Sequence, residues 1–314
     1  MEEISINQTA NSFQWSQFRY AVESEGWVSD DHSVLTLLPN LPSTRTEMAV
    51  DKDGNFIGAV VWNEYDEMAF IGFYIVKAEA RGSGIGTNLW NRAIKRIGTK
   101  LTALRAVPRM LPKYEARGFP IRGRQLYKYF LPSSKLISTF SVLVPEHQTQ
   151  HIISFSEVNH QQRTALHAYD KYVTGRDRSQ FLQLFMNHEQ VRGKILLSAT
   201  GEIIGYSAIV PTGLPERRLY KLAPLYADQL YNALSLALCI LREHQQENKD
   251  SEIVILTVED SIGSEQLNPI IENAASITAQ QGGVTLFNAD PFPSMRMLYA
   301  KCYIPHNNSS HYDA

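Results

Sequence analysis

The sequence contains a short internal repeat, and this repeat limits the folds that the chain can adopt. Residues 53–58 read Asp-Gly-Asn-Phe-Ile-Gly, and residues 200–205, at an offset of 147 positions, read Thr-Gly-Glu-Ile-Ile-Gly. In both copies the hydrophobic pattern that follows predicts a strand, a turn and an amphipathic helix. The period is too long for a solenoid, so we expect two copies of one α+β unit in the 314-residue chain.

The N-terminal half has alternating strand and helix patterns. The apolar run over 68–76 predicts a strand buried on both faces. The helix after it places Leu89 and Trp90 on its buried side. Helices are predicted over 13–26, from the residues after 86 up to 97, and around residue 114. Strands are predicted over 47–50, 56–62, 68–76 and 101–107, with a closing strand over 125–130.

The C-terminal half repeats this order more loosely. Strands are predicted over 219–222, 253–258 and 297–302, and a helix over 226–242. Prolines and a Ser-, Gln- and His-rich stretch within 131–150 mark the connection between the halves. We predict an α+β fold with mixed, mostly antiparallel sheets flanked by helices. The expected division is a domain over 1–135, a connector over 136–150, a second domain over 151–306 and a tail over 307–314.

Positive charge is concentrated in one segment. The chain has a formal net charge of −2, yet residues 80–114 contain eight Lys or Arg and no Asp or Glu. The rest of the chain therefore carries a net charge of −10. A cationic patch on an acidic body indicates one polyanionic ligand and argues against general nucleic-acid binding. The alternative interpretation is a solvated, basic helix face.

Several classes of protein are not indicated by the sequence. Cys239 and Cys302 form no CxxC motif, and the nine histidines show no metal-ligand spacing, so neither a disulfide framework nor a metal site is expected. The acidic N-terminus does not resemble a signal peptide. No apolar run approaches the ~18 residues that span a bilayer. We expect no membrane association and a cytoplasmic location, with a nuclear one as the alternative.

A glycine-rich loop, Arg81-Gly82-Ser83-Gly84-Ile85-Gly86, lies between the predicted strand and helix. Glycines at this position let backbone N–H groups and the helix N-terminus approach a phosphate. The loop lacks the Gly-Lys-Ser/Thr of a Walker motif. A dinucleotide-binding loop needs an acid about 20 residues further on to bind the ribose, and the first acid after this loop is Glu115. The remaining interpretations are a diphosphate ligand with a further phosphate, or a turn that serves packing only. The second copy has no such glycines, so only the N-terminal half is expected to bind a phosphate.

The segment 75–86, with its strand ending in Val76 and the sequence Glu79-Ala80-Arg81-Gly82-x-Gly84-x-Gly86, resembles the acetyl-CoA signature of the GNAT acetyltransferase superfamily. Ala78 stands where that signature usually has Pro. The segment 114–119 resembles the second GNAT signature, Tyr-x-x-x-Gly-Phe. Segments across nearly the whole chain resemble a tandem-GNAT family, with a catalytic N-terminal domain and a degenerate C-terminal copy; they are 25–27, 70–76, 89–90, 169–181, 224–227 and 296–297.

This resemblance implies acetyl-CoA as cofactor and assigns roles to individual residues. The Val76 N–H would face the thioester oxygen, Tyr114 would protonate the leaving thiolate, and Glu25 is a candidate base. Lys113 and Arg117 would reach the nucleotide phosphates or lie as solvated surface charges. The implied cofactor-binding residues are Tyr74, Ile75, Val76, Arg81, Gly82, Ser83, Gly84, Ile85, Gly86, Thr87, Lys113 and Arg117.

We therefore expect an acetyl-CoA-dependent N-acetyltransferase that transfers acetyl to a primary amine, either a protein lysine or a small amine, in a ternary complex. Three residues depart from the family pattern: Val107 replaces an Asn, Arg105 an Asp, and Met110 a polar residue. These departures keep a second hypothesis open, a non-catalytic acyl-CoA-binding protein on the same scaffold. Asp170 and Arg178 are interpreted as an ion pair between helices or, alternatively, as residues of the acceptor cleft.

Overall fold

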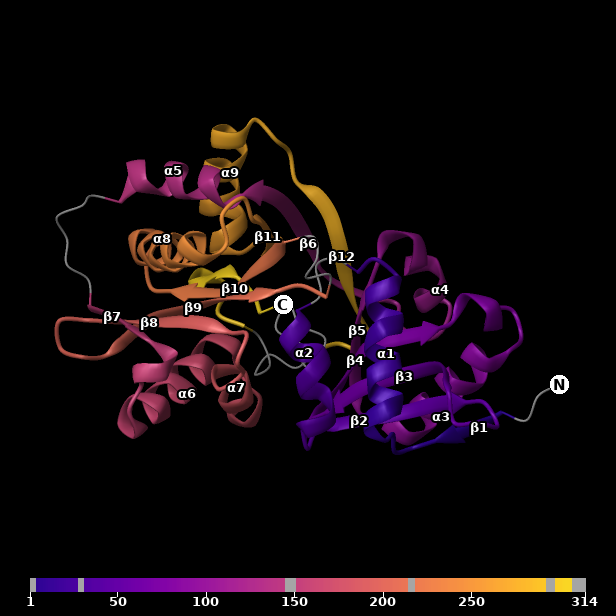
Figure 1. The fold of residues 1–314 in the computed structure, drawn as a ribbon. Coiled ribbons are helices and arrows are strands. Elements are labelled where there is room, and N and C mark those ends of the chain that lie inside the picture. The colour runs from indigo at the N-terminus through magenta and orange to yellow at the C-terminus, as the bar shows by residue number, and fades with distance from the viewer. Residues whose placement is uncertain (1–3, 28–30, 145–150, 214–217, 292–296, 307–314) are drawn as a thin grey trace.

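A computed structural model of the protein describes residues 4–27, 31–144, 151–213, 218–291 and 297–306. Within these residues the strands join into one 13-stranded sheet with helices on both faces, and the two halves of the chain lie side by side (Figure 1). No helix among the described residues is both long enough and apolar enough to cross a bilayer. The predicted tail over 307–314 lies outside the described residues.

The N-terminal half starts with an antiparallel meander, and a parallel strand is then added at its edge. Its elements are β1 (Ser5–Asn7), α1 (Ser12–Ser24), α2 (His32–Leu37), β2 (Thr44–Val50), β3 (Phe56–Glu64), β4 (Met68–Val76), α3 (Ile85–Ile97), β5 (Leu101–Ala106), α4 (Leu111–Glu115), β6 (Ile121–Pro132) and α5 (Ser133–Leu143). Strands β1 to β4 pair antiparallel, and β5 pairs parallel to β4. Helix α1 packs on one face of this sheet and α3 on the other.

The C-terminal half has the same strand order. Its elements are β7 (His151–Ser154), α6 (His160–Thr174), α7 (Ser179–Met186), β8 (Arg192–Leu197), β9 (Ile203–Pro211), β10 (Leu219–Ala227), α8 (Leu230–Glu247), β11 (Glu252–Val258), α9 (Asn268–Ala275), β12 (Gln280–Phe287) and β13 (Cys302–Ile304). Strands β7 to β10 pair antiparallel and β11 pairs parallel to β10, as in the first half. The predicted α+β class with two tandem units is confirmed.

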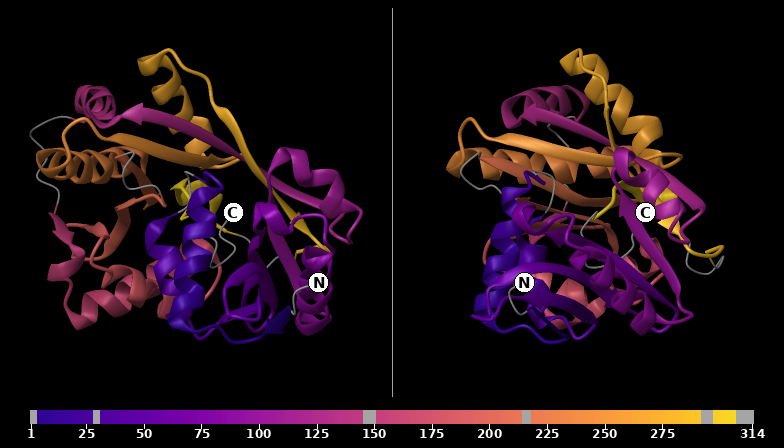
Figure 2. Two further views of the ribbon diagram at one scale, coloured as in Figure 1. Left: turned by 45° about the vertical axis from the view of Figure 1, so that its right-hand side comes forward. Right: turned by 90° about the vertical axis from the view of Figure 1, so that its right-hand side faces the viewer.

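The two halves exchange strands in the middle of the sheet. Strand β12, from the C-terminal half, lies between β5 and β6 and pairs antiparallel with both. Strand β6, from the N-terminal half, pairs with β11 along seven residues, from Leu126↔Val258 to Pro132↔Glu252. Figure 2 shows β12 crossing from the top of the C-terminal half down into the N-terminal half. Each half thus contributes a strand that the other half needs.

Several elements differ from those predicted. The closing strand over 125–130 is longer, 121–132, and pairs with strands of the other half. Helix α5, over 133–143, extends into the predicted connector over 136–150, and its Leu136 and Phe140 are buried in the core shared with α8 and α9. Residues 297–302 were predicted as a strand, but the strand is β13, over 302–304. Residues 145–150 lie outside the described residues.

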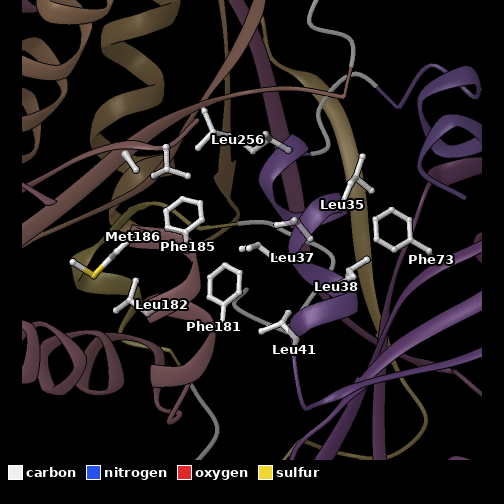
Figure 3. Close-up of a cluster of buried hydrophobic side chains, with 14 of the residues drawn as sticks. Leu35, Leu37, Leu38, Leu41, Phe73, Phe181, Leu182, Phe185, Met186 and Leu256 are labelled. Carbon is white, nitrogen blue, oxygen red and sulfur yellow. The ribbon is translucent and has the colours of Figure 1, made fainter. Parts of the chain in front are cut away.

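A shared hydrophobic core joins the halves at α2. Leu37, Leu38 and Leu41 face Phe181 and Phe185 of α7 (Figure 3), and all five side chains are at most 6% exposed. Burying a side chain of this size stabilises the fold by about 1.5–3 kcal/mol. The two halves are therefore joined by a buried hydrophobic contact as well as by the exchanged strands.

The strand exchange predicts how a cut chain behaves. Cutting between residues 144 and 151 leaves every described strand intact, so we expect the two fragments to remain bound, to elute together in size-exclusion chromatography and to retain function. Residues 1–144 alone lack β12 and β11, the partners of β6, and should show no cooperative thermal unfolding. If this fragment unfolded cooperatively by itself, near the melting temperature of the full chain, the N-terminal half would not depend on β11 and β12 for its fold.

Candidate functional site

The candidate site begins where β4 and β5 separate. Their pairing runs from Met68↔Leu101 to Ile71↔Leu104, although β4 continues to Val76. On the other side of β4, Lys77 N–H donates to the Ile57 carbonyl at 2.9 Å. Antiparallel pairs alternate between bonded and non-bonded residues, so the backbone groups of Val76 and Tyr74 point away from β3, into the gap beside β5.

A cavity of about 790 Å³ occupies this gap. On the α3 face of the sheet it is lined by the glycine loop, Tyr114 and residues of β4. On the α1 face it is lined by Glu25 and Trp27, which follow α1, and by residues from β5, β6, β11 and β12. The cavity therefore has lining residues from both faces of the sheet. Its volume suits a small-molecule site.

The glycine loop has the backbone geometry that its sequence requires. Gly82 and Gly84 have φ values of 84° and 87°, in the left-handed region that favours glycine, and Gly84 is the N-cap of α3. A Cβ on Gly86 would lie 2.6 Å from the Tyr74 hydroxyl oxygen. Any larger residue at 86 would thus displace Tyr74 from the wall of the cavity.

Arg81 and Glu25 form an ion pair beside the loop. The Arg81 Nε also donates to the Val76 carbonyl at 2.9 Å. Both residues line the cavity, so the pair ties the end of α1 to the end of β4. Glu25 is the one carboxylate among the described lining residues, and its oxygen is held by a guanidinium.

Tyr114 lies on the same wall, in an aromatic cluster. Its ring is 5.5 Å from that of Trp90, which is also 5.5 Å from Tyr74. Burial raises the pKa of Tyr114 to about 12, with the nearby Tyr74 adding to the shift and Arg117 opposing it. The hydroxyl therefore keeps its proton at neutral pH, as a proton donor must.

Most of the site residues predicted from the sequence line this one cavity. They are Glu25, Tyr74, Ile75, Val76, Arg81, Gly82, Gly84, Gly86, Thr87, Lys113, Tyr114 and Arg117. Two do not: Ser83 donates its hydroxyl to the Ala80 carbonyl at 2.7 Å, and Ile85 packs against the α3 side of the core. The residues that meet here come from four separate segments, 25, 74–76, 81–87 and 113–117.

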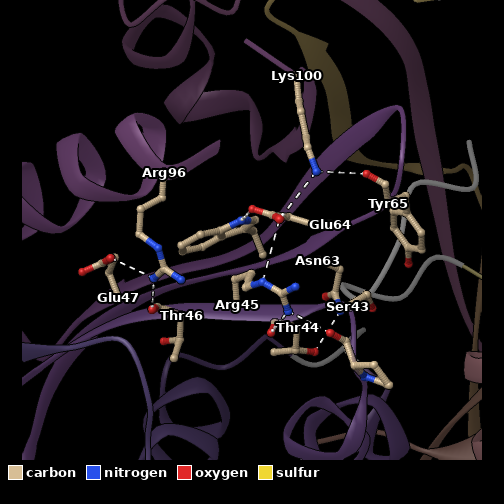
Figure 4. Close-up of polar contacts among 12 residues, drawn as sticks. Ser43, Thr44, Arg45, Thr46, Glu47, Asn63, Glu64, Tyr65, Arg96 and Lys100 are labelled. Carbon is tan, nitrogen blue, oxygen red and sulfur yellow. Dashed lines mark hydrogen bonds and ion pairs between the residues drawn. The ribbon is translucent and has the colours of Figure 1, made fainter. Parts of the chain in front are cut away.

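The cationic segment is only partly a ligand site. Arg92 and Arg96 bind the two oxygens of Glu47, a β2 carboxylate with no exposed side-chain surface, at 2.7 and 2.9 Å. Lys100 lies 3.6 Å from Glu64, and Figure 4 shows this contact together with the one between Arg96 and Glu47. The prediction that the whole +8 segment serves a polyanion is therefore wrong for these three residues, because acids earlier in the chain neutralise them. The segment's cations that line the cavity are Arg81, Arg105, Arg109 and Lys113.

The sequence analysis missed the part of the wall on the α1 face. It includes Phe70, Leu126, Lys128, Leu256 and residues 281–283. Three of these elements, β6, β11 and β12, meet only through the strand exchange. The sequence signal was the Gly282-Gly283 pair, where the pairing of β12 with β6 shifts register.

In the C-terminal half the equivalent gap is filled. Pairing of β10 with β11 stops at Lys221↔Val254, again before β10 ends. Here β13 enters beside β10, with Ile304 opposite Leu225. The backbone N–H of His306 donates to the Tyr226 hydroxyl at 3.1 Å. Asp170 and Arg178 form a buried bidentate ion pair at 2.6 and 2.7 Å. Arg178 also donates to the hydroxyls of Tyr206 and Tyr226, on β9 and β10, and neither member of the pair lines the cavity.

Two family models match the chain, the acetyltransferase (GNAT) family over residues 8–119 and an acetyltransferase (GNAT) domain over residues 166–274. The chain belongs to the GNAT family. It carries two GNAT units and is therefore a tandem GNAT protein. Tyr114 and the glycine loop lie in the first matched region, 8–119, whereas β12 lies beyond the end of the second, at residue 274.

Relatives extend the match over the whole chain. The Caenorhabditis elegans protein F36G3.2, described as uncharacterized, is 34% identical over 323 residues, which span both proteins completely. The holothin acyltransferase of Pseudoalteromonas sp. (strain SANK 73390) is 25% identical over 200 residues, 60% of this chain and 61% of that protein. A solved tandem GNAT protein from the clavulanic acid biosynthesis pathway superposes on this chain with a TM-score of 0.67 at 14% identity. The match covers 92% of this chain and 100% of that one, and it shows that the two share a fold.

GNAT proteins use an acyl-coenzyme A, and the residues present fit this ligand. The left-handed glycines leave open space beside Gly82 and Gly84, where no heavy atom lies within 4 Å of a built Cβ. The Nη1 of Arg117 is buried without a hydrogen-bond partner, while its guanidinium lies 5.6 Å from the Trp90 ring. An anionic ligand would satisfy this nitrogen.

Arg117→Gln tests this assignment. A charge-assisted hydrogen bond contributes about 1.5–3 kcal/mol, so we expect coenzyme A affinity to fall at least tenfold in titration calorimetry. The matched control is Arg122→Gln, since Arg122 is exposed, pairs with Glu115 and does not line the cavity. Equal affinity of both variants and the unaltered protein would remove Arg117 from the ligand site.

Proposed function

We propose that this tandem GNAT protein is an acetyl-CoA-dependent N-acetyltransferase that acts on a primary amine in a ternary complex. The observation that carries the proposal is the cavity that crosses the sheet between β4 and β5. One face supplies a phosphate-binding loop, and the other face supplies a separate chamber. An acyl donor and an amine acceptor could then be held together in one cavity, as direct transfer requires.

The donor's part of the site is on the α3 face. Bound acetyl-CoA would supply a thioester-activated acyl group. The loop from Gly82 to Thr87 and the guanidinium of Arg117 would hold its phosphates. The backbone groups of Tyr74 and Val76, which point into the gap, would orient the donor in the way that a neighbouring strand would. The Val76 N–H is a fixed donor for developing negative charge.

Proton transfer is assigned to Tyr114 and Glu25. Tyr114 is protonated at neutral pH and lines the cavity, so it would donate to a leaving thiolate. A free alkyl amine is mostly protonated near neutral pH, so the acceptor must lose a proton before it reacts. Glu25 would accept this proton, directly or through water, once Arg81 releases its oxygen. Because Glu25 is paired with Arg81, a ligand that draws Arg81 to its phosphates would also release the Glu25 carboxylate.

The holothin acyltransferase similarity supports acyl transfer as the reaction class. One assay distinguishes this transferase from the alternative, a non-catalytic acyl-CoA-binding protein. Thiol release from acetyl-CoA is measured across a panel of small amines and lysine peptides, alongside calorimetric binding of coenzyme A. Release with any amine supports the transferase; tight binding with no release from any acceptor would favour the binding protein.

Tyr114→Phe tests the assigned proton donor. Because general acid catalysis contributes about 10²–10⁴-fold, we expect kcat to fall about a hundredfold while coenzyme A affinity changes less than twofold. With a pKa of about 12, Tyr114 stays protonated up to about pH 11, so the variant should keep the same rate–pH profile below pH 10. Tyr172→Phe, on the exposed side of α6, is the control. An unchanged kcat would exclude Tyr114 from the mechanism.

A further inference from the structure

The α1 face of the cavity contains a tryptophan whose ring is held in one orientation. Trp27 follows α1 and lines the cavity, and it is only partly buried. Its ring stacks against that of Phe73, on β4, with the centroids 6.0 Å apart and the ring planes at 15°. Part of the indole therefore packs on the hydrophobic core, while its remaining surface belongs to the cavity wall.

A chain of buried rings supports Trp27 from below. Phe73 is 1% exposed and makes an edge-to-face contact with Phe18 of α1, with the centroids 5.3 Å apart and the planes at 89°. Phe18 has no exposed surface and contacts Phe56 of β3 in a similar way, at 6.0 Å. These rings come from three different elements, so the fold itself sets the orientation of Trp27. A flat surface that is already in place loses little side-chain entropy when a ligand binds to it.

The carboxylate proposed as the base lies beside this ring. Glu25 and Trp27 both line the cavity and are separated by Gly26, whose φ is 69°. Two residues of chain span at most about 7 Å, so a molecule whose amine reaches Glu25 needs only a short chain to place a further group on Trp27. Arg81 contacts both Glu25 and the Val76 carbonyl. An amine beside Glu25 is therefore also near the end of β4, where the donor is proposed to bind.

Apolar groups continue the wall on the same face of the sheet. Leu126 of β6 and Leu256 of β11 line the cavity and belong to the core that also contains Phe73. Gly282 and Gly283 of β12 line it with backbone alone, and a Cβ on Gly282 would lie 2.9 Å from the Leu126 Cβ. The chamber on the α1 face thus offers a ligand apolar contacts in addition to the indole.

The exposed indole surface favours an aromatic acceptor over a lysine side chain. The reacting amine has to be neutral, so its nitrogen gains no cation–π attraction in the reactive state. The four methylenes of a lysine have no ring to stack on Trp27. An aromatic pair, in contrast, strengthens binding about two- to tenfold beyond the effect of the area that it buries.

We propose that the acceptor is an arylalkylamine, a primary amine joined to an aromatic ring by a short carbon chain, and that its ring stacks on Trp27. This inference rests on the proposed acyl transfer and names its acceptor class in place of protein lysines. In the transfer the amine nitrogen bonds to the acetyl carbonyl carbon, and the carbon–sulfur bond breaks. The amine proton passes to Glu25, and the Tyr114 proton passes to the sulfur.

The test compares matched acceptors in the thiol-release assay. They are 2-phenylethylamine, 2-cyclohexylethylamine, which has the same carbon skeleton without an aromatic ring, and Nα-acetyl-lysine amide. We expect kcat/KM for the unprotonated amine to be at least threefold higher with the phenyl than with the cyclohexyl compound, and at least tenfold higher than with the lysine amide. Trp27→Leu should lower the phenyl-to-cyclohexyl ratio at least threefold, through KM, and Trp27→Phe should keep most of it.

Two controls separate stacking from folding. Tyr20→Leu makes the same kind of change on α1, at an aromatic residue that is 72% exposed and does not line the cavity, and it should leave all ratios unchanged. Each variant should also keep its melting temperature and its coenzyme A affinity. If Trp27→Leu fails to fold, the three acceptors compared with the unaltered protein still test the proposal, because a phenyl-to-cyclohexyl ratio of one would overturn it.

The outcomes distinguish this inference from the proposed function. Preference for the lysine amide, or a phenyl-to-cyclohexyl ratio that Trp27→Leu leaves unchanged, would overturn the arylalkylamine acceptor and leave the transferase standing. No release with any amine would overturn the transferase. In that case calorimetric binding of 2-phenylethylamine to the coenzyme A complex decides the inference. Binding that Trp27→Leu weakens at least threefold supports it, and absent binding, or binding that this variant leaves unchanged, overturns it.

Discussion

The insertion of β12 between β5 and β6 is the contact on which the rest of the molecule depends. It converts two repeated units into one continuous sheet and closes the N-terminal half with a strand made about 180 residues later. The same insertion sends β6 and α5 into the C-terminal half, where they complete its core. Neither half has a full set of strand partners without the other.

The two copies differ in whether a further strand fills the gap between their parallel strands, and this determines whether the gap is a cavity or part of the core. In both, the parallel pair of strands separates partway along its length, after Ile71 in the first copy and after Lys221 in the second. In the first copy the gap is a cavity with backbone groups directed into it. In the second, β13 enters the gap and Tyr226 is buried with no exposed surface. The second copy then serves the first by supplying β12, β11 and their side chains to the cavity wall.

The sequence identified the parts of the site that are local. A glycine loop between an apolar strand and an amphipathic helix has a pattern readable within twelve residues, and the same holds for Tyr114 and its neighbours. The α1-face chamber could not be read in this way, because Arg105, Lys128 and Gly283 come from strands whose pairing is set by tertiary packing. The charge count had the same weakness: Arg92 and Arg96 appear free along the chain, and their partner Glu47 precedes them by about 45 residues. Acids and bases that neutralise each other over that distance leave no local signal.

The strand exchange also sets an order in time. A chain emerging from the ribosome completes residues 4–144 long before Phe287, the last residue of β12. At about 5–20 residues per second, the N-terminal half waits roughly 7–30 s for the strand that covers β5. During that interval β12 is absent from the edge of β5 and the cavity lacks the wall that β11 and β12 supply, so the site is incomplete on a nascent or truncated chain. Ligand-binding capacity thus reports that nearly the whole chain has been made.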